Sequence, residues 1–502
     1  MSLAQVLTRA QCGVDAPEVR VEVHLSSGLP SLSLVGLPET AVKESKDRVR
    51  SALINSGFDF PAKRITINLA PADLPKEGGR YDLAIALGIL AASAQIPSQA
   101  LQQHEFIGEL ALSGGLQPVR GALPVALQAA KQQRRLVAPQ DNGAEISLCR
   151  DADAVTASSL AEVSAYLHGQ QTLSASTPTD LTEETSCTLD LADVRGQQQA
   201  KRALEIAAAG QHNLLFIGPP GTGKTMLASR LPGLLPAMSD AEALQAAAVH
   251  SLSSRSLDWL QHWRQRPFRA PHHTASGIAL VGGGAHPKPG EISLAHGGVL
   301  FLDELPEYSR KVLDVLREPL ESGRIVISRA QQSVEYPAQF QLLAAMNPCP
   351  CGYHGDPGGR CRCTQEQVQR YQSQASGPLL DRIDMHVAVP PVPITQLQQL
   401  PTGETSQQVR IRVMAAREQQ LQRQGCSNAQ LSSRQCQQLC QLQAEDEQWL
   451  RQTAEQLKLS ARGYHRLLKI ARTIADLAQQ PDISRIHLAE AIGYRALDRY
   501  LT

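Results

Sequence analysis

A glycine-rich segment near the middle of the chain restricts the fold more than any other feature of the sequence. It has the pattern G-x-x-x-x-G-K-T and consists of Gly218, Pro219, Pro220, Gly221, Thr222, Gly223, Lys224 and Thr225. An apolar run at 214–217 precedes it, and helix-favouring residues follow at 226–229. A strand, a glycine-rich turn and a helix in this order direct backbone N–H groups and a helix N-terminus at a phosphate. The sequence therefore predicts a phosphate-binding loop in an α/β sheet.

A second motif completes a nucleotide site. The apolar run 299–302 ends at Asp303 and Glu304, about eighty residues after the loop. We expect Lys224 to contact the β- and γ-phosphates of ATP, Thr225 and Asp303 to hold Mg²⁺, and Glu304 to polarise the attacking water. The alternatives are a glycine turn that only packs and an exposed acidic helix start. The two motifs together favour an ATPase.

Length and composition predict three domains. A chain of 502 residues exceeds one ordinary hydrophobic core. Residues 169–187 are rich in Ser and Thr and contain no Lys or Arg, which is typical of a linker. We predict domains at 1–168, 188–392 and 393–502.

Hydrophobic patterns assign a class to each domain. Alternation at 19–25 and 65–69 predicts half-buried strands, and helical spacing at 42–56 and 81–92 makes the first domain α+β. Continuous apolar runs within 212–217, 298–302 and 340–345 predict parallel strands buried on both faces. Residues 407–424 and 446–478 are patterned as helices, which predicts a helical lid.

Composition excludes some classes of protein. No run approaches 18 apolar residues and the first twenty residues do not resemble a signal peptide, so we expect a cytoplasmic protein without membrane contact. Lys+Arg and Asp+Glu are equal at 48 each, so any nucleic-acid contact must come from a local basic surface. Six scattered cysteines indicate reduced thiols: Cys12, Cys149, Cys187, Cys426, Cys436 and Cys440.

The remaining four cysteines form two C-x-C pairs. They are Cys349, Cys351, Cys361 and Cys363, and they bracket a turn-forming loop. Four thiolates can close a tetrahedral site on Zn²⁺, although C-x₂₋₄-C is the commoner spacing. His354 is a candidate to replace one thiolate, and reduced loop thiols or a redox-labile pair are the alternative. The cysteine cluster begins two residues after Asn347, so a metal bound there would stiffen this region and have a structural role.

Several segments together resemble a known family. They are 193–198, 298–307, 316–321, 345–352 and 377–384, and nearly the whole chain is covered. They resemble the ComM/YifB family of bacterial competence proteins, a magnesium-chelatase-like group of AAA+ ATPases. The resemblance implies an α/β AAA+ P-loop core with a helical lid.

The resemblance also implies residue roles and a function. Asn347 would be the first sensor, Arg382 an arginine finger acting on the ATP of a neighbouring subunit, and Arg462 the second sensor, with Arg466 a substitute. A finger supplied between subunits requires a ring, and the family implies a hexamer. The expected function is an ATP-dependent DNA motor, a branch migration helicase in natural transformation and homologous recombination.

Two insertions are candidates for DNA contact. By the resemblance, 264–291 forms a loop facing the pore of the ring, and 323–337 forms a hairpin before the first sensor. Lys288 and Arg329 are then placed to touch a phosphate backbone, single-stranded or branched. Solvated loops with ordinary charges are the alternative. We assign His272, His273 and His286 no chemistry.

The N-terminal domain resembles the Lon-protease-like domain at 31–53, 75–88 and 106–121. Arg80 stands where the protease pattern has its nucleophilic serine, and the partner lysine is missing near 123–125. Without a nucleophile and an activating base the domain cannot catalyse acyl transfer, so we expect the fold to serve assembly or DNA binding. Lys43, Lys46, Arg48 and Arg50 would give it a basic helix, with a solvated charged helix as the alternative.

Three other functions compete with the DNA motor. One is a remodeller of a protein or metal-insertion complex, resembling the magnesium chelatase motor subunit. An ATP-dependent protease is disfavoured by Arg80. A scaffold that uses ATP only to assemble is disfavoured by Glu304, Asn347 and Arg382.

Overall fold

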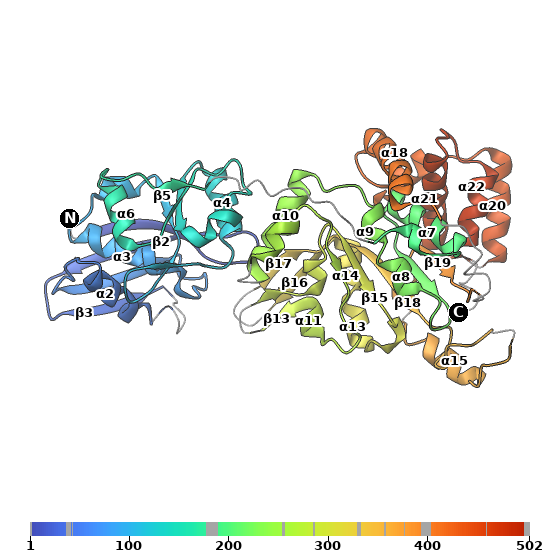
Figure 1. Ribbon diagram of the computed structural model, residues 1–502, viewed down its shortest axis with the longest axis horizontal. Coiled ribbons are helices and arrows are strands. Elements are labelled where there is room, and N and C mark those ends of the chain that lie inside the picture. Colours follow the sequence, from blue (N-terminus) through green and yellow to red (C-terminus); the bar gives the residue numbers. More distant parts are fainter. Residues whose placement is uncertain are drawn as a thin grey trace.

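The computed structural model describes residues 3–36, 42, 44–176, 189–253, 257–284, 287–328, 333–355, 358–375, 377–392, 403–457 and 459–495. An N-terminal α+β unit, a central α/β unit and a group of C-terminal helices follow one another along the molecule (Figure 1). Of the predicted linker, residues 177–188 lie outside the described residues. Among the helices that are described, none has the length and apolar character to cross a membrane.

The N-terminal unit is built on a mixed eight-stranded sheet. Its order is β10-β9-β8-β5-β1-β2-β4-β3, and β10 pairs with β9, so the sheet extends into the predicted linker. Val19, Val21 and Val23 of β2 are buried and alternate with more exposed residues, as the sequence predicted. The apolar helix α3, Asp82–Ala92, is buried along its whole length. The strands are β1 (Leu3–Arg9), β2 (Glu18–Ser26), β3 (Ser31–Val35), β4 (Arg64–Ala70), β5 (His104–Phe106), β8 (Arg135–Pro139), β9 (Ala154–Ala157) and β10 (Ser174–Ala175), with a small hairpin of β6 (Glu109–Leu110) and β7 (Leu116–Gln117). The other helices are α2 (Ser45–Asn55), α4 (Ala122–Lys131), α5 (Gly143–Ile146) and α6 (Leu160–Leu167).

The central unit contains a parallel five-stranded sheet in the order β12-β15-β18-β11-β19. The three continuous apolar runs of the sequence are the adjacent strands β11 (Leu214–Ile217), β18 (Gln341–Met346) and β15 (Val299–Leu302). Alternate residues of each strand enter two different cores, one on each face. The outer strands are β12 (Phe268–Arg269) and β19 (Met385–Ala388). The helices are α7 (Gln198–Gly210), α8 (Lys224–Ala228), α9 (Leu231–Leu234), α10 (Asp240–Ser253), α11 (Gly277–Val281), α12 (Glu291–Leu294), α13 (Arg310–Val315), α14 (Arg317–Ser322), α15 (Gln365–Gln372) and α16 (Gly377–Leu380). Two hairpins complete it, β13 (Gly282–Gly283) with β14 (Lys288–Pro289), and β16 (Arg324–Ser328) with β17 (Ser333–Pro337).

The C-terminal helices share a hydrophobic core with α7 and one face of this sheet. They are α18 (Ser406–Gln424), α19 (Ser433–Leu439), α20 (Ala444–Gln456), α21 (Ala461–Leu477) and α22 (Arg485–Gly493). Arg417 of α18 donates to the carbonyl oxygens of Ala208 at 2.9 Å and Ala209 at 3.0 Å, at the end of α7. The run predicted as helical at 446–478 is two helices, because the Ser460 hydroxyl accepts the N–H of Gly463 and starts α21 anew.

The N-terminal and central units are joined through α10. The backbone N–H of Gly121 donates to Ser251 O at 3.0 Å, and the Ser251 hydroxyl donates to Glu145 Oε2 at 2.6 Å. Gly121 has a φ of 70°, and a Cβ there would lie 2.8 Å from Leu252 Cδ2. A side chain at position 121 would therefore be strained by the backbone and would have to displace Leu252 at the joint.

Arg80 lies near this joint rather than in a catalytic pocket. Its guanidinium is buried and donates to Gln11 Oε1 at 2.8 Å and to the carbonyl oxygen of Arg120. The side chain that replaces the protease serine therefore holds together loops of the N-terminal unit.

The expected basic helix is only partly present on α2. Arg48 Nε donates to Asp82 Oδ2 at 2.8 Å, and this carboxylate on α3 is buried. Arg50 lies over the Phe60 ring at 5.3 Å. Lys43 lies outside the described residues. The prediction that Arg48 belongs to a solvent-facing basic surface is corrected, because Arg48 forms an ion pair with the buried Asp82.

The N-terminal sheet contains a buried ion pair whose removal should be costly. Arg9 of β1 donates to both oxygens of Glu105 on β5 at 2.6 and 2.7 Å, and the two side chains are 2% and 0% exposed. Arg9→Ala leaves the buried Glu105 carboxylate with the partly exposed Arg134, at 3.2 Å, as its remaining cation, so we expect a loss of up to about 3–5 kcal/mol in the stability of this sheet. Hydrogen exchange of peptides from β1, β2 and β5 measures it.

Arg20→Ala is the matched control, because Arg20 is 59% exposed in its pair with Glu18. It should cost no more than about 1 kcal/mol. Equal acceleration of exchange in both variants would contradict the importance of the buried pair.

Candidate active site

The phosphate loop has a backbone that requires its glycines. Gly221 and Gly223 have φ angles of 77° and 87°, in the left-handed region that side chains disfavour. At Gly218 a Cβ would lie 2.2 Å from Val389 O. The Thr222 hydroxyl donates to Pro219 O at 2.9 Å and closes the loop on itself. The loop between β11 and α8 is thus a tight cradle at a helix N-terminus.

Lys224 connects this cradle to the residue after β18, the strand next to β11 in the sheet. Its Nζ donates to Gly218 O at 2.7 Å, to Pro219 O at 2.9 Å and to Asn347 Oδ1 at 3.1 Å. Burial lowers the pKa of Lys224, and the negative charges of Asp303 and Glu304 oppose that shift. The ammonium therefore lies between the loop and the predicted sensor.

The two residues expected to hold Mg²⁺ are in direct contact. Thr225 Oγ1 donates to Asp303 Oδ2 at 2.6 Å, and the N–H of Glu304 donates to Asp303 Oδ1 at 2.9 Å. A hydroxyl beside a carboxylate suits a hard cation that prefers oxygen ligands. The residues present therefore fit Mg²⁺.

Glu304 has an unusual backbone and an unpredicted partner. Its φ is 53°, uncommon for a residue with a side chain, and its carboxylate is half exposed. His273 Nδ1 lies 3.0 Å from Glu304 Oε2. The Tyr308 hydroxyl donates to Pro271 O at 2.6 Å and holds the segment that carries His273. His273, to which the sequence assigned no chemistry, is therefore a neighbour of the predicted catalytic base.

A single cavity of about 420 Å³ gathers these groups. It is lined by residues 220–226, Asp303, Glu304, Met346 and Asn347. The arrangement can bind the phosphates of a nucleotide and activate a water beside them.

The predicted arginines lie elsewhere. Arg382, Arg462 and Arg466 line a second cavity of about 450 Å³ that shares no lining residue with the first. Arg382 donates to Pro378 O at 2.6 Å and pairs with Glu321, while Arg466 Nε lies 3.3 Å from Asp384 Oδ1. The Arg462 side chain is exposed and makes no hydrogen bond or ion pair with the part of the chain that is described. The structure therefore brings the arginines to one another and not to the phosphate loop of their own chain.

The candidate DNA-contacting hairpins pack on each other. Lys288 is exposed on β14, and the Tyr336 hydroxyl of β17 donates to Pro287 O at 2.8 Å. A Cβ at Gly282 would lie 3.0 Å from Ile327 Cδ1. Arg329 and His286 lie outside the described residues.

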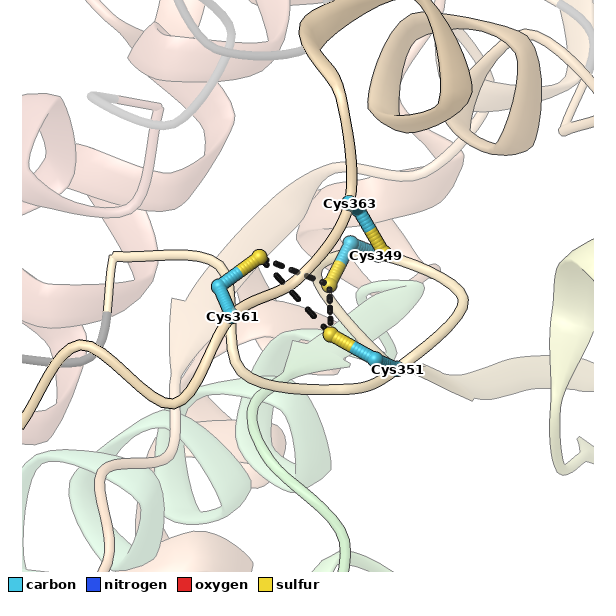
Figure 2. A group of neighbouring side chains, drawn as sticks. All are labelled: Cys349, Cys351, Cys361 and Cys363. Carbon is cyan, nitrogen blue, oxygen red and sulfur yellow. Dashed lines mark hydrogen bonds between the residues drawn. The ribbon is translucent and has the colours of Figure 1, made fainter.

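The four clustered cysteines point toward one another (Figure 2). Cys349 Sγ lies 3.3 Å from Cys351 Sγ and 3.9 Å from Cys361 Sγ, and Cys351 Sγ lies 3.7 Å from Cys361 Sγ. All four sulfurs are within 4.8 Å of one another, and the group does not include His354. Backbone N–H groups of Arg362 and Tyr353 lower the pKa of Cys351 to about 6. His354 contributes its backbone N–H, which donates to Cys349 Sγ at 3.3 Å.

Removing the lysine tests the nucleotide cavity. Lys224→Ala deletes a charge-assisted contact to phosphate worth about 1.5–3 kcal/mol, so we expect binding of Mg–ATP to weaken about 10- to 100-fold. Titration with a fluorescent ATP analogue measures it. Lys311→Ala, an exposed lysine on α13, is the control. Equal affinity in the two variants would exclude Lys224 from the site.

Comparison with known proteins agrees with the geometry. Three family models match: "Subunit ChlI of Mg-chelatase" at 21–142, "Magnesium chelatase, subunit ChlI" at 190–397 and "Magnesium chelatase, subunit ChlI C-terminal" at 403–495. The chain is 55% identical to competence protein ComM of Haemophilus influenzae, covering 100% of this chain and 99% of that protein. It is also 55% identical to YifB of Escherichia coli, covering 100% and 98%. A magnesium-chelatase 38 kDa subunit of Cereibacter sphaeroides is 27% identical over 30% of this chain and 51% of its own length. The chain therefore belongs to the ComM/YifB family of magnesium-chelatase-like proteins, and its central sheet fits an α/β AAA+ core.

Proposed function

We propose that this protein is an ATP-driven DNA motor, a branch migration helicase that acts in natural transformation and homologous recombination. The observation that carries the ATPase is the single cavity that holds Lys224, Thr225, Asp303, Glu304 and Asn347. The name of the Haemophilus relative, a competence protein, supports the setting in DNA uptake.

Each residue of the cavity has a step in ATP hydrolysis. Lys224 balances the charge of the phosphates, and Asn347 orients the water against the γ-phosphate. Glu304 accepts the proton of that water as it attacks. Thr225 and Asp303 would hold Mg²⁺, which would neutralise charge on the phosphate oxygens.

The link to DNA is the segment between β12 and α12. It carries His273, whose imidazole lies 3.0 Å from the Glu304 carboxylate, and exposed Lys288 fifteen residues later. A phosphate backbone that binds at Lys288 therefore acts on the same segment that contacts the catalytic base. This continuity supports hydrolysis coupled to movement along DNA.

The second cavity supports a ring. Arg382 lies apart from its own phosphate loop, which supports a role as a finger on the ATP of a neighbouring subunit. Arg462, in the same second cavity, would be the second sensor. We assign a hexamer, with residues 403–495 as its helical lid and the N-terminal unit as a Lon-like fold. Arg80, buried and engaged with a carbonyl, provides no nucleophile for a protease.

A second candidate is an ATP-driven remodeller like the magnesium chelatase motor subunit. The similarity to the Cereibacter subunit favours it, but that similarity covers 30% of this chain. The DNA motor is favoured by the competence protein of Haemophilus influenzae, which matches 100% of this chain.

A synthetic four-way DNA junction tests the function directly. We expect the chain with Mg–ATP to convert the junction into duplex products. Glu304→Gln should bind ATP and lose at least about 100-fold in rate, because the general base is removed. Glu307→Gln makes the same chemical change at an exposed position and is the control. A junction left intact while ATP is hydrolysed would contradict the motor and favour the remodeller.

Mixing variants tests whether Arg382 acts between subunits. Arg382→Ala chains should hydrolyse ATP about 10³-fold more slowly or worse, and Glu304→Gln chains at least about 100-fold more slowly. In a mixed ring some interfaces combine an intact Arg382 with an intact Glu304, so the mixture should be faster than either variant alone. A mixture no faster than its components would mean that both groups act within one chain.

A further inference from the structure

The cysteine cluster has the dimensions of a tetrahedral metal site. Four sulfurs bound to Zn²⁺ at about 2.3 Å lie about 3.8 Å from one another. The separations of 3.3, 3.7 and 3.9 Å among Cys349, Cys351 and Cys361 bracket that value, and Cys363 lies within 4.8 Å of the others. They are far from the roughly 2.05 Å of a disulfide bond. The thiols are free and preorganised for a cation that prefers sulfur.

The surrounding segment has little else to give it a structure. Between β18 and α15 the described residues contain no helix or strand, and an irregular segment of this length is uncommon without a functional reason. Few of the side chains in this segment are apolar, so it has little with which to form a hydrophobic core. Of its cysteines, Cys349 is buried, while Cys351, Cys361 and Cys363 are partly exposed. A metal bound by both C-x-C pairs would supply the missing cross-link.

Both ends of the segment are fixed to the catalytic unit. Pro348, next to Asn347, accepts a hydrogen bond at its carbonyl oxygen from Gln372 Nε2 at 3.0 Å. Cys363 precedes Thr364, which caps α15 by accepting the N–H of Gln367. Gln372 lies on α15 and binds Pro348, the residue after Asn347. A metal that joins the two C-x-C pairs would therefore hold both ends of the segment between Pro348 and α15 together.

The turn inside the cluster touches the phosphate loop. Gly352 follows Cys351, its N–H donates to Cys349 O at 2.9 Å, and its φ is 84°. A Cβ at position 352 would lie 2.5 Å from Pro220 Cδ. The backbone of the cysteine turn is therefore in close contact with the loop that cradles the phosphates.

We propose that Cys349, Cys351, Cys361 and Cys363 hold one structural Zn²⁺ as thiolates, and that this metal braces the phosphate loop through Gly352 and Pro220. Each thiol loses its proton to solvent as it binds, and four protein ligands leave no open position for catalysis. The N–H of His354 supports the Cys349 thiolate from outside. The effect on nucleotide binding rests on the proposed ATP site, whereas the metal site does not.

Metal analysis of the full chain tests the first half of the proposal. We expect about one zinc per chain, and almost none in the double variant Cys361→Ser/Cys363→Ser, since two thiolates do not hold a structural site. Cys426→Ser removes a cysteine outside the cluster and should keep its zinc. Traces of zinc only, iron in its place, or a disulfide within the cluster would overturn the metal assignment.

Nucleotide titration of the same samples tests the brace. With a fluorescent ATP analogue and Mg²⁺, the double variant should bind about tenfold more weakly than the Cys426→Ser control. Gly352→Ala keeps all four thiols and should retain its zinc, yet also bind nucleotide about tenfold more weakly, because a Cβ would push against Pro220. Unchanged affinity in Gly352→Ala or in the zinc-free variant would overturn the brace. Zinc in an unaltered chain that binds no nucleotide would instead overturn the proposed ATP site.

Discussion

The hydrogen-bonded register of three parallel strands determines where the chemistry of this protein lies. Ile217 of β11 pairs with Met346 of β18, so the residues that follow, Gly218 and Asn347, leave the sheet side by side. The N–H of Gly218 donates to Met346 O at 3.2 Å and continues the ladder by one step. Leu302 of β15 pairs with Ala344 and places Asp303 at the same edge. Because the carboxyl ends of parallel strands share one edge, three loops far apart in sequence become one site.

This constraint explains which parts of the site the sequence predicts. β11, β15 and β18 are continuous apolar runs. β11 is followed by the glycine-rich loop, β15 by Asp303 and Glu304, and β18 by Asn347. β12 has only two residues, Phe268 and Arg269, within a segment that the sequence assigned to an exposed loop. Yet β12 pairs in parallel with β15, so the residues after Arg269 reach the same edge, and His273 meets Glu304 there. Periodicity cannot detect so short a strand, which is why His273 was missed.

Charges were harder to place than strands, since their role depends on tertiary partners. Arg48 looks like a solvated cation on the sequence of α2, but the fold sets it against buried Asp82, 34 residues later. The sequence pattern also did not show the break between α20 and α21. Ser460 caps α21 because the backbone is extended at that residue, and this conformation cannot be read from the helical pattern. The cysteine spacing suggested a metal site, whereas the contact of Gly352 with Pro220 depends on where the turn packs.

The nucleotide cavity and the second cavity, which lies between the central unit and the C-terminal helices, differ in charge. The first is lined by one cationic side chain, Lys224, and two carboxylates, so ATP would add more negative charge to a site already rich in it. The second is lined by four cations, Arg382, Arg462, Arg466 and Lys469, and two carboxylates. Arg382 Nε and Arg466 Nη1 are buried there with no hydrogen-bond partner in the described structure, an arrangement that costs free energy in the isolated chain. A neighbouring chain that presents its nucleotide would satisfy both the charge and the free donors. Because the two surfaces differ, such contacts would be head to tail, and contacts of this kind that close on themselves would form the proposed ring.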